Sequence, residues 1–143
     1  MFEFLRKKRN KPPAAYQIGQ KAGAAMAEAV ETYLNHRLAE VSEKMLALLQ
    51  QRFTTIHDEP EHAPELVAKV EYQIFMGHLE TLPARIHQEA HDALGKWFDI
   101  ARKSGVLDEL NRLIETRINE ARMKLMGESL AMFAEACALE KKA

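Results

Sequence analysis

The sequence has little of several residue types, and each shortage excludes a class of protein. Its 143 residues contain one cysteine, so no disulfide can form within the chain and no zinc site built from several cysteines is available. We interpret this residue, Cys137, as a small apolar helix residue rather than a reactive thiol. No apolar run approaches the ~18 residues of a membrane-spanning helix. The N-terminal apolar residues are few and precede the cations, which does not fit a secretory signal.

Glycine and proline are also scarce, with six and five residues, which favours long uninterrupted helices. The glycine-rich phosphate-binding motifs and the nucleophile-elbow motif are both missing from the sequence. The formal net charge of −1 gives no sign of nucleic-acid binding. We therefore expect a protein that is not an enzyme and uses no cofactor, with an enzyme lacking any recognisable motif as a remote alternative.

What the sequence does contain is helical periodicity. Apolar residues recur at steps of three and four, which predicts helices over about residues 14–57, 64–103 and 107–141. The residues expected in the buried stripes are Ile18, Ala22, Met26, Val30, Leu34, Leu38, Val41, Met45, Leu49, Phe53 and Ile56, then Val70, Ile74, Leu79, Ile86, Ala90, Ala93, Trp97 and Ile100, then Leu107, Leu110, Ile114, Ile118, Ala121, Leu125, Met132, Ala136 and Leu139.

Prolines and glycines indicate where these helices end. Pro60, in the acidic segment HDEPEHAPE at 57–65, predicts a tight turn, and Ser104-Gly105 after two cations predicts a second one. Pro83 either kinks the second helix or ends it, and three helices of similar length favour the kink. The fold prediction is all-α, an elongated antiparallel three-helix bundle with coiled-coil packing over residues 14–143. A four-helix bundle broken at Pro83 is the alternative.

Six histidines raise the question of a metal site. His87 and His91 stand i, i+4 on one helix, and a hairpin turning near residue 60 places His36 within about a turn of His87. A metal site at these three residues is one hypothesis. The favoured one is that the histidines are exposed to solvent or lie at the edge of an interface. The acidic turn also carries side chains that can bind cations, and we favour a solvated turn there. These side chains are His57, Asp58, Glu59, Glu61 and His62.

Small residues cluster near the start of the first expected helix. Gly19 and Gly23 form a small-xxx-small pair in an alanine-rich stretch, which allows close approach of two helix backbones. One interpretation is a thin core against the third helix, and the other is a self-association face that forms a homodimer.

The first 13 residues differ from the rest in charge. They carry a net charge of +4, whereas the remaining residues carry −5, so a basic arm joins a mildly acidic body. The apolar and basic residues of the arm are Phe2, Phe4, Leu5, Arg6, Lys7, Lys8, Arg9 and Lys11. Together they are typical of a segment that docks on an anionic membrane surface. The alternatives are a tail folded back on the bundle, and docking on an acidic protein or nucleic acid, of which nucleic acid is disfavoured.

These features favour a non-catalytic adaptor or scaffold of the cytoplasm. We expect it to bind protein partners through its helix faces and to touch the inner face of the membrane through its basic arm. The alternative is a ligand- or metal-binding helical bundle that uses His36, His87 and His91.

The membrane hypothesis predicts that the protein sediments with vesicles of anionic lipid. Deleting residues 1–11 should abolish sedimentation, because it removes all five cations and the apolar residues of the arm. Added salt should weaken binding of the full chain, because it screens the attraction between exposed charges. Sedimentation that survives the deletion would contradict the hypothesis.

Overall fold

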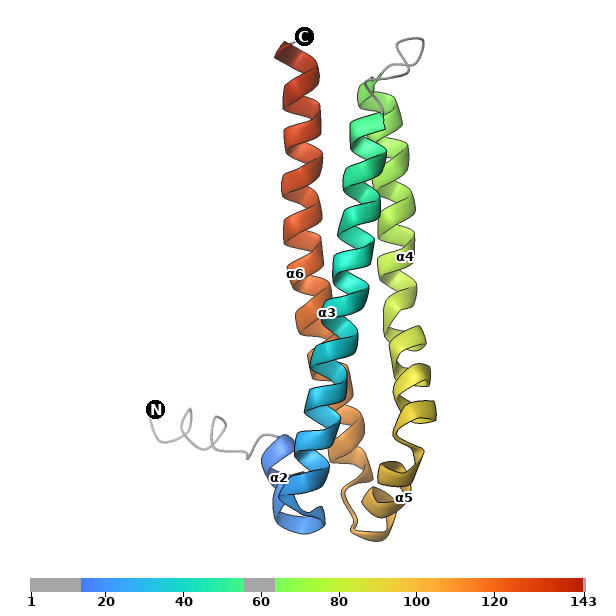
Figure 1. Ribbon diagram of the computed structural model, residues 1–143, viewed down its shortest axis with the longest axis vertical. Coiled ribbons are helices and arrows are strands. Elements are labelled where there is room, and N and C mark those ends of the chain that lie inside the picture. The colour runs from blue at the N-terminus through green and yellow to red at the C-terminus, as the bar shows by residue number, and fades with distance from the viewer. Residues whose placement is uncertain (1–13, 56–63, 143) are drawn as a thin grey trace, which may run out of the picture. The chain divides into compact units, whose positions relative to one another are not determined.

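The computed structural model describes residues 14–55 and 64–142, and all of its regular structure is helical. The elements are α2 (Ala14–Ala22), α3 (Ala24–Thr55), α4 (Pro64–Ala93), α5 (Gly95–Lys103) and α6 (Leu107–Lys142) (Figure 1). The described residues contain no strand, which confirms the all-α prediction. Among these helices, none is both long and apolar enough to cross a membrane. The basic arm at 1–13 and the acidic turn predicted at 58–63 lie outside the described residues.

The prediction of one helix over about residues 14–57 is wrong in one respect, because this segment forms two helices. Gly23 separates α2 from α3 and has φ +103°, a backbone conformation that glycine adopts without the steric cost paid by other residues. Its N–H donates to the carbonyl of Gly19 at 3.1 Å, which closes the last turn of α2. The chain changes direction there (Figure 1). Steps of three and four in the apolar pattern carry across this break, so periodicity alone does not reveal it.

The second expected helix is also divided, but Leu94 separates the parts. Leu94 has φ −112° and ψ 22° and lies between α4 and α5, next to Gly95, a weak helix former. Pro83 stands inside α4, which continues through it, so the helix is not broken at Pro83. Leu82 and Ile86, near Pro83 in the sequence, are 1% and 0% exposed. Their burial offsets the hydrogen bond that proline cannot donate.

The predicted turn at Ser104-Gly105 is confirmed and has the geometry of a Schellman motif. Gly105 has φ +73°, and its N–H donates to the carbonyl of Arg102 at 3.3 Å. The next N–H, of Val106, donates to the carbonyl of Ala101 at 2.9 Å. Both Ala101 and Val106 are fully buried, which is the apolar contact that usually accompanies this motif.

The described chain divides into two compact units. Unit 1 contains the chain up to Asn35 together with His87–Arg117. In it α2 packs against α5, and an ion pair joins α3 to α6, with Arg117 Nη2 donating to Glu31 Oε1 at 3.1 Å. The buried residues of this unit are Ile18, Met26, Val30, Leu34, Ala90, Leu94, Phe98, Ala101, Val106, Leu110, Leu113 and Ile114.

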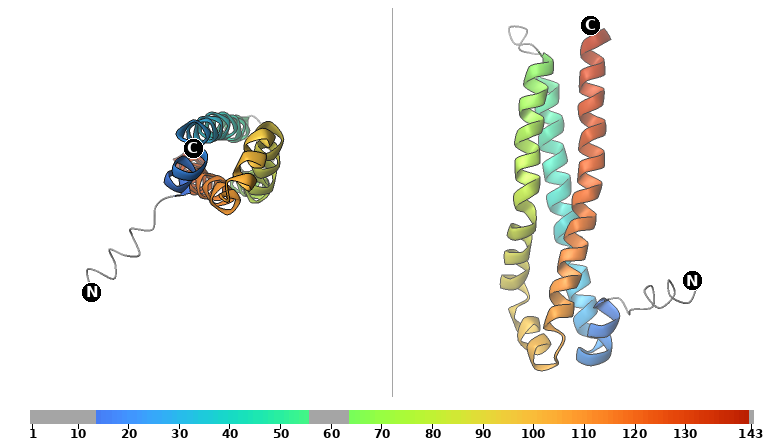
Figure 2. Two further views of the ribbon diagram at one scale, coloured as in Figure 1. Left: turned by 90° about the horizontal axis from the view of Figure 1, so that it is seen from below. Right: turned by 180° about the vertical axis from the view of Figure 1, so that it is seen from behind.

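Unit 2 contains His36–Ile86 and the chain from Ile118 onward, so it is built from parts of α3, α4 and α6. Within it α3 and α4 run in opposite directions, and α6 runs in the same direction as α3 (Figures 1 and 2). The buried residues are Leu38, Val41, Leu49, Phe53, Ala68, Phe75, Leu79, Leu82, Ile86, Ile118, Leu125 and Ser129. Ser129 is the polar member of this set, and its hydroxyl donates to the carbonyl of Met126 at 3.1 Å.

The break at Gly23 generates a prediction with a matched control. Gly23→Ala should lower the free energy of unfolding by about 1–2 kcal/mol, because alanine is strained at positive φ. Gly19→Ala should raise it by about 0.5–1 kcal/mol, because Gly19 is inside α2 and a Cβ there meets no atom within 4 Å. Urea unfolding of both variants measures the difference. Equal effects would contradict a glycine-dependent break at residue 23.

Candidate functional site

The residues predicted from the sequence as sites have different outcomes. Phe2, Phe4, Leu5, Arg6, Lys7, Lys8, Arg9 and Lys11 lie outside the described residues, so docking of the arm stays a prediction. Gly19 and Gly23 do not share a helix, because α2 ends before Gly23. A Cβ built on either glycine meets no atom within 4 Å, so neither one marks a close approach of backbones. Self-association through this pair stays a prediction.

The structure gives no support to the hypothesis of a metal site at His36, His87 and His91, which stays a prediction. His36 belongs to unit 2, whereas His87 and His91 belong to unit 1. No group of three or more His, Cys, Asp or Glu side chains in the described ranges is placed to hold a metal ion. The His36 side chain is 82% exposed, and its Nε2 lies 3.8 Å from Glu40. The His91 ring stacks on Phe98 with 4.3 Å between ring centroids. No geometry within either unit therefore supports the predicted metal site.

Unit 2 has a groove between α3 and α4 that we call the cationic groove. Its cavity volume is about 470 Å³. The apolar lining residues are Val41, Met45, Leu48 and Leu49 from α3, and Ile74 and Phe75 from α4. The polar and charged lining residues are Arg37, Lys44, Arg52, Glu71, His78 and Arg85. Four of these side chains are cations and one is an anion, so the groove has an apolar floor with a mostly positive rim.

The helical period explains why these residues share one surface. On α3 the lining positions run from Arg37 to Arg52 at spacings of three and four, which keeps them on one side of the helix. Leu49 is 3% exposed and belongs to the core, whereas its neighbour Leu48 is 52% exposed and forms the wall. On α4, Phe75 and Ile74 divide in the same way, at 5% and 52% exposed. The groove therefore lies between the exposed sides of α3 and α4, next to the sides that are buried in the core.

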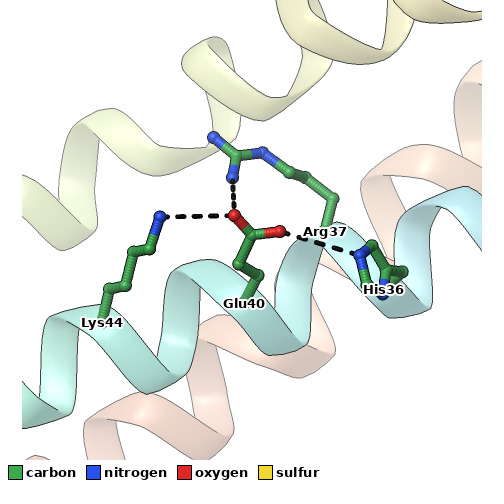
Figure 3. A network of polar contacts seen from close by, with 4 residues as sticks. All are labelled: His36, Arg37, Glu40 and Lys44. Atoms are coloured by element: carbon green, nitrogen blue, oxygen red, sulfur yellow. Dashed lines mark hydrogen bonds and ion pairs between the residues drawn. The ribbon is translucent and has the colours of Figure 1, made fainter.

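A carboxylate on α3 connects three basic side chains at this rim (Figure 3). Glu40 Oε1 accepts hydrogen bonds from Arg37 Nη1 and from Lys44 Nζ, each at 3.3 Å. His36 approaches the other oxygen of Glu40. Pairs of this kind at partly exposed sites contribute little stability, about 0.3–0.5 kcal/mol each. Their effect is to hold Arg37 and Lys44 in defined positions beside the groove.

An aromatic cluster packs the three helices of unit 2 together. Phe133 on α6 stacks on Tyr72 of α4, with 4.9 Å between ring centroids, and lies 6.3 Å from Phe53 of α3. Tyr72 also stacks on Phe75, which lines the groove, at 6.3 Å. Aromatic pairs contribute about 0.5–1.5 kcal/mol beyond the area that they bury. The cluster thus fixes the α4 wall of the groove from behind.

The apolar periodicity did not predict this groove, because it placed two exposed residues of α4 in the buried stripe. Val70 and Ile74 were expected in the buried stripe, and they are 48% and 52% exposed. The α4 core instead runs through Ala68, Phe75, Leu79, Leu82 and Ile86. Spacings of seven, four, three and four among these residues form a helical stripe as regular as the expected one. The presence of two apolar stripes side by side was the signal that α4 has more apolar surface than one core can bury.

Comparison of the chain with models of protein families, with curated proteins and with solved structures finds no match.

The division between wall and core at Leu48 and Leu49 can be measured directly. Leu49→Ala should lower the free energy of unfolding by about 2–5 kcal/mol, because it leaves a cavity in the core. Leu48→Ala removes the same atoms from a half-exposed side chain, so it should change the free energy of unfolding by less than about 0.5 kcal/mol. Denaturant titration of the two variants provides the comparison. A large loss in Leu48→Ala would mean that this side chain is buried.

Proposed function

We propose that the protein is a non-catalytic helical adaptor that binds protein partners through the helix faces of unit 2. The observation that carries the proposal is the uneven distribution of exposed apolar side chains. In the described ranges eight large apolar side chains are exposed, and seven of them belong to unit 2. They are Leu48, Leu66, Val70, Ile74, Met123, Met126 and Leu130. Exposed apolar residues that gather in this way are typical of surfaces that bind another protein.

These side chains support two binding faces rather than one. Leu66, Val70 and Ile74 follow each other at i, i+4 and i+8 on α4, and Ile74 lines the cationic groove. Met123, Met126 and Leu130 form a second stripe at i, i+3 and i+7 on α6. No residue of α6 lines the groove, so the α6 stripe lies outside it. Two apolar faces on one unit are what an adaptor that connects two partners requires.

The proposal retains the predicted architecture, an elongated antiparallel three-helix bundle. Its support is the length of α3 and α6, with 32 and 36 residues, and the continuity of α4 through Pro83. Short connections between long helices favour antiparallel neighbours.

We also propose that the protein acts in the cytoplasm and docks on the inner face of the membrane. Its support is the composition of residues 1–13, which combine a net charge of +4 with three large apolar side chains after Met1. Each cation near an anionic lipid surface contributes about 1 kcal/mol, and the apolar residues add an insertion term.

Photo-cross-linking in native cells tests the adaptor function. A photoreactive amino acid replaces Leu48 in the groove or Met123 in the α6 stripe, and the control replaces Glu43, an exposed charged residue of α3 outside the groove. We expect Leu48 and Met123 each to yield a defined cross-linked protein and Glu43 to yield none, because apolar faces form the centre of most interfaces.

The result that would contradict the adaptor function is equal labelling from all three positions. A cross-link from the chain to itself at both Leu48 and Met123, with no second protein, would indicate a homodimer and no adaptor.

A further inference from the structure

The cationic groove differs in charge from the surface around it. Residues 14–143 carry a net charge of −5. The groove lining has four cationic side chains and one acidic side chain, Glu71. A positive groove on a negative body favours an acidic partner and repels a basic one. The chain's own basic arm has the wrong sign to occupy the groove.

The dimensions of the groove suit one side of a helix. Arg37 and Arg52, at its two ends on α3, are 15 residues apart, which is about 22 Å of helix. A cavity of about 470 Å³ spread over that length is too narrow for a whole helix, which is about 10–12 Å wide with its side chains. There is room for one row of side chains. A helix lying on the groove would insert this row between α3 and α4, as ridges pack into grooves in helical proteins.

The openness of the walls argues against a small molecule as the occupant. Leu48 of α3 and Ile74 of α4 both line the groove, and each is 52% exposed. Pockets for small molecules usually enclose most of the surface of the ligand, about 70–90%. A long open surface with an apolar floor instead has the properties of a groove that binds an amphipathic helix.

We infer that the cationic groove binds an amphipathic α-helix of a partner protein that carries acidic residues beside its apolar stripe. This inference rests on the proposed adaptor function and names the class of partner. Apolar side chains of the partner, at spacings of three and four, contact Leu48 and Ile74. Its carboxylates lie beside Arg52, where a guanidinium can donate two parallel hydrogen bonds to one carboxylate.

Binding of designed peptides to the full chain tests this inference. The probe is a fluorescent helical peptide of about 18 residues, long enough to cover the groove, with a leucine stripe flanked by glutamates. The control peptide has the same leucines flanked by lysines. Fluorescence anisotropy should show saturable binding of the acidic peptide and none of the basic one. Raising NaCl from about 0.05 M to about 0.5 M should weaken binding, because salt screens exposed charges.

Protein variants then locate the binding site. Leu48→Asp should weaken binding of the acidic peptide by about tenfold or more, since it places a charge on the apolar wall. Arg52→Glu should also weaken it, and does so without altering the apolar floor. Ala47→Asp is the matched control, because Ala47 is an exposed residue of α3 next to Leu48 that does not line the groove. It should leave the affinity unchanged. Far-ultraviolet circular dichroism verifies that each variant is folded.

Several results would overturn the inference. Equal affinity for the two peptides would show that charge has no role in binding. Equal weakening by Leu48→Asp and Ala47→Asp would show that the groove is not the binding site. A dimer of the wild type that Leu48→Asp dissociates, with no binding of peptide, assigns the groove to a second copy of the chain. Binding of dodecanoate that depends on Leu48, again with no peptide binding, assigns it to an anionic amphiphile. Cross-linking at Leu48 to another protein without peptide binding overturns only the class of partner and leaves the adaptor function intact.

Discussion

The structure of unit 2 depends on one constraint, which is that its helices carry more apolar surface than three helices can cover. A helix buries only the part of its circumference that faces its neighbours. In α3 and α4 the apolar residues extend past that part, so Leu49 and Phe75 enter the core while Leu48 and Ile74 do not. The groove follows directly from this excess. Unit 1 contrasts with it, because Tyr16 is its one exposed large apolar side chain in the described ranges.

Much of the fold could be predicted from the sequence, because it depends on period and on helix ends. The all-helical class, the extent of α6 and the turn at Gly105 all follow from apolar spacing and from cations before a glycine. The helix breaks at Gly23 and Leu94 could not be predicted from apolar spacing. Both lie where the apolar period continues, so the local backbone conformation decides where the helix breaks. Gly23 has a positive φ, which glycine adopts readily, and Leu94 departs from helical geometry with φ −112° and ψ 22°.

The candidate site was harder to predict, because it depends on which of two adjacent stripes the core covers. Val70 and Ile74 fit a buried stripe as well as Ala68 and Phe75 do, and only packing against the other helices separates them. The aromatic cluster around Phe133 decides the rotation of α4, since Tyr72 stacks on that ring. Contacts between residues so distant in the sequence cannot be predicted from the spacing of apolar residues.

Glu40 has a consequence for selectivity that follows from its position between two cations. Because one oxygen already accepts hydrogen bonds from Arg37 and Lys44, an anion arriving from solution competes with a resident counter-ion. A phosphate or a single carboxylate has no apolar contact with which to offset that competition. A ligand that also covers Leu48 and Ile74 gains such an apolar contact. Glu40 therefore lowers the affinity of the groove for simple anions and favours molecules that carry both an acidic group and an apolar surface.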